Sequence, residues 1–167
     1  MFYLRNLKSK TRLLKFRNSL FALLLLFIIS CGGKDPFIFE DDLTTVPPAF
    51  STAGVTPTTT ESGLIIYGLE AGSGDIEAGI RDAVRVYFTG RKTNGEIFDS
   101  SYKNGQTTPS AFTVANLIDG FTEGLIGMKE GGKRVLVIPP SLGYEGTASQ
   151  LRNDTLVFDV ELDSIIF

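Results

Sequence analysis

The chain has no histidine and no tryptophan, and it has a single cysteine among its 167 residues. The lack of histidine excludes Ser-His-Asp and Cys-His catalysis, and it excludes a metal site with histidine ligands. One cysteine cannot form a disulfide within the chain. The glycines do not follow GxGxxG or Walker spacing, so no phosphate-binding loop is expected. These absences exclude the kinds of catalysis and of binding site just named, and no cofactor or metal is expected.

Basic residues are scarce beyond the first 30 positions. Residues 1–30 contain six of the sixteen Lys and Arg residues and no acidic residue, so the remainder has ten basic against nineteen acidic residues, a net charge of −9 (10 − 19). Nucleic-acid phosphates are held by clustered Lys and Arg side chains. The charge distribution therefore argues against nucleic acid as a partner.

Residues 1–30 have the pattern of a signal peptide. A basic stretch over 1–17 precedes the apolar run Leu20–Ile29, which at ten residues is too short to span a bilayer. Cys31 follows directly, and the run from Ile28 to Cys31 resembles the lipobox of bacterial lipoproteins. That resemblance implies cleavage before Cys31 and lipidation of its thiol, which gives membrane attachment. An ordinary secretory signal or an uncleaved anchor is the alternative.

Residues 31–61 are rich in proline, threonine and serine and show no sustained period of 2 or 3.6. Such composition predicts a flexible or partly extended tether. The folded domain is then expected over 62–167.

Alternating apolar and polar residues predict most strands of that domain. Val84, Val86 and Phe88 alternate with more polar neighbours over 82–91, and residues 155–162 alternate in the same way. Asn94-Gly95 predicts a hairpin, because both residues tolerate positive φ. The other expected strands are 64–69, 96–101, 111–114 and 134–138.

One short helix is expected between these strands. Ile118, Phe121, Leu125 and Met128 recur at roughly helical spacing, and Gly131-Gly132 is expected to end the helix. Alternating strands favour an antiparallel sheet with one covered face. The fold class is therefore α+β, with about five strands and one helix that buries its apolar side on the sheet.

Six collinear motifs resemble the FKBP-type peptidyl-prolyl isomerases. The motifs cover essentially all of residues 62–167, and they are ESGLIIYGL (61–69), VRVYFTG (84–90), GEIFDSS (95–101), LIDGFTEGLIGMKEGGKRVLVIPP (117–140), LGY (142–144) and TLVFDVEL (155–162). The resemblance implies a curved antiparallel sheet wrapped around the helix. It also implies an aromatic pocket between sheet and helix that takes a proline ring.

The resemblance also assigns site residues. The implied catalytic set is Phe88, Phe98, Asp99, Ile118, Phe121, Tyr144 and Phe158, and the implied substrate-binding set is Leu117, Gly143 and Phe112. The Ile118 backbone N–H is the implied donor to a substrate carbonyl, while Asp99 is given no acid–base role. Taken without the resemblance, a phenylalanine on an alternating strand is usually a core residue.

Three features depart from the family pattern. Phe88 stands where the family commonly has a tyrosine, and Phe121 stands where its best-known members have a tryptophan. The loop over 145–154 is shorter than usual and has Leu151 as its one large apolar residue.

The expected function is prolyl isomerisation in proteins outside the cytoplasm, by a monomer held at a bacterial envelope membrane through Cys31. The resemblance implies macrolide binding in the same pocket. The alternative is an FKBP-like binding module or chaperone that holds proline-containing segments without isomerising them.

Overall fold

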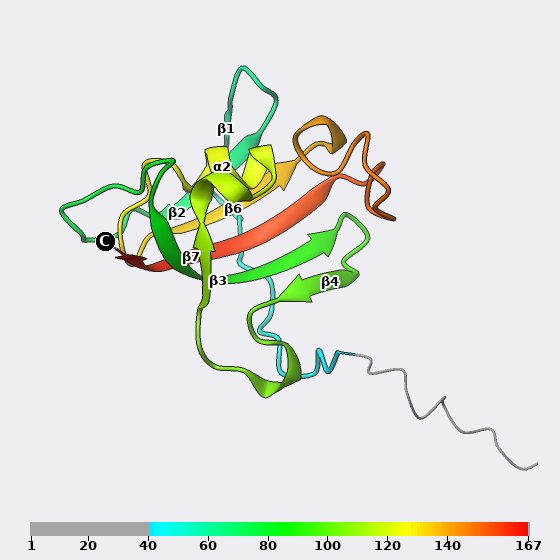
Figure 1. Ribbon diagram of the computed structural model, residues 1–167, viewed down its shortest axis with the longest axis horizontal. Coiled ribbons are helices and arrows are strands. Elements are labelled where there is room, and N and C mark those ends of the chain that lie inside the picture. The colour runs from blue at the N-terminus through cyan, green and yellow to red at the C-terminus, as the bar shows by residue number, and fades with distance from the viewer. Residues whose placement is uncertain (1–40, 167) are drawn as a thin grey trace, which may run out of the picture. The chain divides into compact units, whose positions relative to one another are not determined.

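The computed structural model describes residues 41–166, in which a strongly twisted antiparallel sheet packs against one short helix (Figure 1). All strand pairs are antiparallel, and the order across the sheet is β1-β2-β6-β7-β3-β4, with β5 beside β4 on the same edge of β3. The strands are β1 (Thr58–Thr59), β2 (Ile65–Glu70), β3 (Ala83–Lys92), β4 (Ile97–Ser100), β5 (Ser110–Thr113), β6 (Lys133–Ile138) and β7 (Leu156–Ile166). The helix is α2 (Asp119–Leu125), and 3-10 turns occupy Lys103–Gly105, Val114–Asn116 and Pro140–Leu142.

The predicted α+β class and antiparallel pairing are confirmed, while the number of strands is seven rather than about five. The extra pairing arises partly from β1, which adds to the β2 edge from a region expected to be a tether. The last strand is also longer than its alternating core, because it continues to Ile166 along the full length of β3. Within the described residues, no helix is long and apolar enough to cross a membrane.

Strand alternation divides the sheet into an inner and an outer face. On β3, Val84, Val86 and Phe88 point to the inner face and are buried together with the apolar side of α2. Strand β7 contributes its own alternate residues from Leu156 to Leu162 to the same core. The buried inner face therefore follows the period of 2 that the sequence predicts.

Close approach of α2 to the sheet depends on glycine. A Cβ at Gly124 would lie 2.3 Å from the Leu136 side chain, and one at Gly120 would lie 2.6 Å from Ile138. These two glycines face β6, so the helix backbone rests almost directly on that strand. The helix carries Phe121 between them, which places that ring in the core between helix and sheet.

The helix ends earlier than the sequence predicts. Its last residue is Leu125, and Gly127 takes a φ of 75°, so Gly127 and not Gly131-Gly132 provides the left-handed conformation at the helix end. The guanidinium of Arg134, from β6, donates hydrogen bonds to the carbonyls of Gly124 (2.8 Å), Ile126 (3.1 Å) and Gly127 (3.3 Å). A strand side chain thus satisfies the carbonyls that a short helix leaves unpaired. Burial lowers the pKa of Arg134, although the group stays charged.

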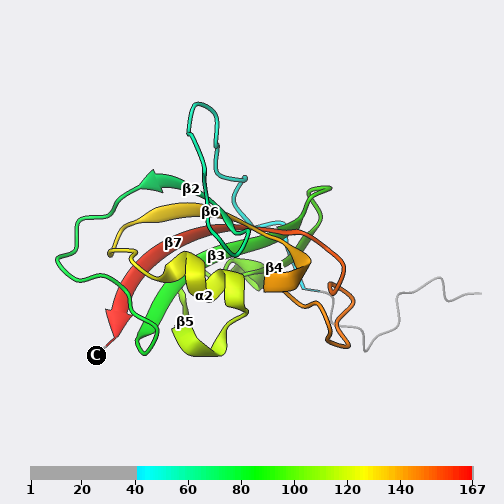
Figure 2. The same ribbon diagram turned by 90° about the horizontal axis from the view of Figure 1, so that it is seen from above.

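Residues 41–50, here called the strap, pack on the outer face of the sheet, opposite α2 (Figure 2). They belong to the same compact unit as the domain, so the predicted tether over 31–61 differs from the structure over 41–61. The part of that prediction over 31–40, the signal peptide over 1–30 and the lipidation of Cys31 lie outside the described residues.

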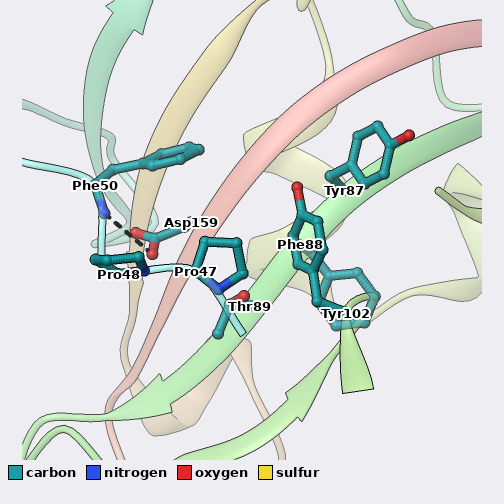
Figure 3. A pocket seen from close by; sticks show the side chains of 8 residues that line it. All are labelled: Pro47, Pro48, Phe50, Tyr87, Phe88, Thr89, Tyr102 and Asp159. Atoms are coloured by element: carbon teal, nitrogen blue, oxygen red, sulfur yellow. Dashed lines mark hydrogen bonds between the residues drawn. The ribbon is translucent and has the colours of Figure 1, made fainter. Parts of the chain in front are cut away.

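A buried ion pair fixes the strap. Arg91 and Asp159 pair on the outer face with only 9% and 6% of their surface exposed. Arg91 also donates to the Pro47 carbonyl at 3.1 Å. Asp159 accepts from the Phe50 backbone N–H at 3.2 Å (Figure 3). The strap thus supplies the remaining hydrogen-bond partners of two charges that it also shields from water. Pro47 and Pro48 line a small gap of about 20 Å³ beside Tyr87 and Tyr102.

Candidate active site

An open cavity of about 260 Å³ lies between the inner face of the sheet and the entrance of α2. This volume is near the lower end of the roughly 300–1,000 Å³ found for small-molecule sites. The residues that line it are Phe88, Phe98, Asp99, Phe112, Asn116, Leu117, Ile118, Phe121, Tyr144 and Phe158. The structure thus brings together nine of the ten site residues expected from the sequence, drawn from segments that are up to 70 positions apart (158 − 88).

The walls of the cavity are five phenylalanines, each from a different element. Phe121 from α2 and Phe158 from β7 meet edge to face with ring centroids 4.9 Å apart, and Phe98 from β4 meets Phe158 in the same way at 5.4 Å. Phe88 from β3 adds edge contacts to Phe112 of β5 at 5.7 Å and to Phe121 at 6.2 Å. Such edge-to-face contacts hold aromatic rings in fixed orientations. The aromatic walls of the cavity are therefore apolar and fixed in orientation.

Gly90 makes this arrangement possible. A Cβ at this position would lie 2.6 Å from the Phe98 ring and 2.7 Å from the Phe158 ring. The two rings therefore meet over the bare backbone of β3, in the space that any other side chain would fill. The glycine of the VYFTG motif is a steric requirement of the aromatic wall.

The mouth of the cavity is formed where the chain enters α2. Leu117 and Ile118 precede the helix, and the Thr122 hydroxyl fixes this corner by donating to the Val114 carbonyl at 2.8 Å. None of the described residues accepts a hydrogen bond from the Ile118 backbone N–H, whereas the Ile118 carbonyl is used by the first helical turn. A backbone donor is thus left for a ligand at the cavity mouth.

Asp99 is the one charged side chain among the residues that line the cavity. Its Oδ1 accepts a hydrogen bond from the Ser100 N–H at 2.9 Å and pairs with the Lys103 ammonium at 3.0 Å. The hydrogen bond to Asp99 is the main cause that raises the pKa of Lys103 above its ordinary value. Phe88 offers Asp99 no hydroxyl, so the partner of this carboxylate comes from the loop that follows β4.

One predicted site residue does not line the cavity, and one residue that lines it was not predicted. Gly143 does not line the cavity, because its N–H turns back to the Pro140 carbonyl at 3.0 Å and closes the 3-10 turn after β6. Asn116 does line it, although the sequence did not indicate it. Asn116 lies in the 3-10 turn just before the helix entrance, and a polar residue in a turn carries no pattern of its own.

The loop over 145–154 contributes nothing to the cavity lining. Thr147, Ser149 and neighbouring groups of this loop bond among themselves, and Leu151 packs on the core from outside the cavity. This loop therefore adds no wall to the cavity on that side, which agrees with its short length. Tyr144 is the last residue on that side that reaches the cavity.

Residues 74–163, more than half of the chain, match the FKBP_C family, described as FKBP-type peptidyl-prolyl cis-trans isomerase. An FK506-binding protein of Neisseria meningitidis serogroup B is 43% identical over 103 residues, which are 60% of this chain and 94% of that protein. The chain belongs to the FKBP-type peptidyl-prolyl cis-trans isomerase family. The strap lies before the region that matches the family.

Longer relatives match over a similar share of this chain. A probable FKBP-type peptidyl-prolyl cis-trans isomerase of Haemophilus influenzae is 45% identical over 107 residues, 62% of this chain and 43% of that protein. FkpA of Escherichia coli is 43% identical over 106 residues, 62% of this chain and 38% of that protein. The match thus spans less than half the length of these two relatives.

Solved structures agree with the fold. The crystal structure of FkpA from Escherichia coli superposes with a TM-score of 0.60 at 41% identity, covering 65% of this chain and 51% of that one. The crystal structure of AtFKBP13 gives a TM-score of 0.58 at 28% identity, covering 66% of this chain and 99% of that one. The predicted family and fold class are therefore confirmed.

Proposed function

We propose that the protein is a peptidyl-prolyl cis–trans isomerase that acts on proline-containing segments of proteins outside the cytoplasm. The observation that carries the proposal is the cavity itself. Five phenylalanine rings enclose it, and its mouth offers the backbone N–H of Ile118 beside Leu117. Membership in the isomerase family supports the same reading.

The reaction suits a site with no nucleophile. Rotation about a peptide bond has a barrier of about 18–20 kcal/mol, and no bond is broken. The twisted amide loses its resonance and therefore becomes less polar than the planar amide. A dry aromatic cavity solvates that twisted state better, relative to the planar state, than water does. The five phenylalanines provide such surroundings for the proline ring.

Two polar groups at the mouth would hold the chain during rotation. The Ile118 N–H would donate to a substrate carbonyl and fix one side of the prolyl bond. Asp99 is a carboxylate paired with Lys103, so it cannot donate to a carbonyl, and it takes no part in acid–base chemistry. Asp99 would instead contribute to the electrostatic field at the cavity mouth and would orient water molecules there.

The test uses the full chain in mild detergent and a Leu-Pro peptide, with isomerisation followed by NMR exchange. We expect acceleration above the uncatalysed rate, and we expect Phe121→Ala and Phe158→Ala each to lower kcat/KM by about tenfold or more. Ile76→Ala is the matched control, because Ile76 is an apolar side chain that is 52% exposed and outside the cavity. No acceleration by the wild-type chain would refute the enzyme assignment.

A second candidate function is a binding module that holds proline-containing segments without isomerising them. The low rim over 145–154 and the absence of a hydroxyl on Phe88 favour it. The same NMR experiment separates the two, since a binding module shifts the resonances of the peptide while the exchange rate stays at the uncatalysed value. A macrolide that occupies the cavity would compete with the peptide under either function.

We also propose that Cys31 carries a lipid anchor that holds the protein at a membrane of the bacterial envelope. The support is the apolar run that ends directly before Ser30 and Cys31. In cells fed a labelled fatty acid, Cys31→Ala is expected to abolish labelling of the protein. In a detergent phase partition of the cell extract, the same substitution is expected to move the protein from the detergent phase to the aqueous phase. Labelling that survives the substitution would refute the anchor. Light scattering of the detergent-solubilised chain would test the expectation that it is a monomer.

A further inference from the structure

The acidic start of the strap holds the loop that follows β4. The Asp42 N–H donates to the Asn104 side-chain oxygen and the Asn104 N–H donates to the Asp42 carbonyl, both at 2.7 Å. The Asn104 amide also donates to Asp41 Oδ1 at 2.9 Å. Asn104 has a φ of 58°, a left-handed conformation that asparagine tolerates better than most residues. Strap and loop therefore form one clamped unit.

Lys103 stands between this clamp and the cavity. Its ammonium is 3.0 Å from Asp99 Oδ1 and 3.3 Å from Asp41 Oδ2. One cation is thus shared by a carboxylate of the cavity and a carboxylate of the strap. The pKa of Lys103 is raised, first by Asp99, so the ammonium stays charged at neutral pH. The pKa of Asp41 is lowered, first by the Asn104 amide and then by Lys103, so it stays ionised.

The three groups fix the charge of the cavity mouth. Asp99, Lys103 and Asp41 sum to one negative charge, which would become two without Lys103 and zero without the Asp41 carboxylate. All three side chains are partly exposed, with 43%, 35% and 49% of their surface accessible, so a substrate side chain beside the proline meets their field. Asp99 is the one charged side chain that lines the cavity, as far as the described residues show, and Lys103 reaches the cavity through its ion pair with Asp99.

We propose that Lys103, held in place by Asp41 of the strap, is a specificity-determining residue that sets the charge presented to the substrate side chain preceding the proline. The proposal rests on the proposed function of the cavity as a prolyl-peptide site. Asp41 is a positioning residue, because it acts through Lys103 and lines no part of the cavity. Asp41 precedes residues 74–163, the region that matches the family, whereas Asp99 and Lys103 lie within that region.

The experiment measures kcat/KM and Kd of the full chain for three peptides that differ only in the residue before proline: Lys, Leu or Glu. Lys103→Met keeps the length of the side chain and removes its charge. We expect it to raise several-fold the ratio of kcat/KM for the Lys-Pro peptide to kcat/KM for the Glu-Pro peptide. One unit charge in water, several ångströms from the charged substrate side chain, changes the binding of each peptide by about two- to threefold, in opposite directions. The Leu-Pro value stays within about twofold, and 0.5 M salt reduces the effect.

Asp41→Asn is expected to move the ratio in the opposite direction and by less, because Asp41 lies farther from the cavity. Lys103→Arg restores the wild-type ratio, which a purely steric role of the side chain would not require. The matched control is Lys92→Met, since Lys92 also forms an i,i+4 ion pair, but its partner Glu96 does not line the cavity, whereas Asp99, the partner of Lys103, does. The control leaves the ratio unchanged.

An unchanged ratio for Lys103→Met in both kcat/KM and Kd overturns the proposal, and so does an equal shift in the Lys92→Met control. The Kd values separate this outcome from a failure of the proposed enzyme function. If the wild-type chain accelerates no peptide but Lys103→Met still shifts the Kd ratio, the isomerase assignment fails and the role of Lys103 stands.

Discussion

The sheet buries side chains on both its inner and its outer face, but by different means. On the inner face, apolar side chains of β3 and β7 pack with α2, and the aromatic residues among them leave an open cavity. On the outer face, Thr89, Arg91 and Asp159 are buried polar groups, and the strap supplies backbone partners to Arg91 and Asp159. The same two strands thus build a site with one set of alternate residues and an anchor for the strap with the other.

The two faces are therefore sensitive to different kinds of substitution. The inner face depends on side-chain volume, because neighbouring side chains occupy the space that a Cβ at Gly90, Gly120 or Gly124 would need. The outer face depends on charge compensation, because removing one partner leaves the other charge buried. Substitutions on each face should therefore fail in different assays.

Asp159→Ala is expected to have the largest effect on stability. It leaves Arg91 unpaired beneath the strap, so we expect a loss of about 3–5 kcal/mol in the free energy of unfolding measured with urea. Asp163→Ala, at an exposed position of the same strand, is the control and is expected to stay within about 0.5 kcal/mol of wild type. The double change Arg91→Met with Asp159→Leu should recover much of the loss. Equal losses for Asp159→Ala and the control would refute charge compensation on the outer face.

Gly90→Ala tests the inner face. The new methyl group overlaps the Phe98 and Phe158 rings, so we expect a loss of about 1–3 kcal/mol together with weaker peptide binding. Thermal unfolding and NMR titration with the Leu-Pro peptide measure the two effects. Gly68→Ala on β2 is the control, because no atom lies within 4 Å of the Cβ it would add. Wild-type binding by Gly90→Ala would mean that the rings do not need this space.

The smallest effect is the pH response of the contact between strap and loop. Because the pKa of Asp41 is lowered from 3.8, its contribution is present at neutral pH and is lost only as the pH falls through the lowered value. The side-chain amide resonances of Asn104, which donates to Asp41, are expected to titrate with a midpoint below 3.8. Asp41→Asn should abolish that step, while Asp42→Asn should keep it. A midpoint at or above 3.8 would contradict the ion pair with Lys103.

The inner face was largely predictable from the sequence. The alternation of Val84, Val86 and Phe88 places them in the core, and the resemblance to the family gathered nine of the ten cavity residues. Asn116 was missed because a polar residue in a 3-10 turn has no periodic signature. Gly143 was carried over from a motif, although its local turn directs its backbone away from the cavity.

The outer face was not predictable in the same way. Arg91 and Asp159 occupy the polar positions of alternating strands, which the pattern alone assigns to solvent. Their pairing joins residues 68 positions apart, and their other partners are the Pro47 carbonyl and the Phe50 N–H. Nearly every residue offers a backbone carbonyl and every residue except proline offers an N–H, so composition cannot reveal that this segment is docked through such groups.

The cap that Arg134 forms on α2 has a consequence for amide hydrogen exchange. A helix of seven residues is too short to be stable alone, and its final carbonyls are bound by a side chain of β6. Its amides are therefore expected to exchange together with those of β6, in one cooperative opening, rather than by fraying from the helix end. Phe121 then belongs to the slowest-exchanging part of the molecule, and conformational freedom at the cavity is left to the loops around its mouth.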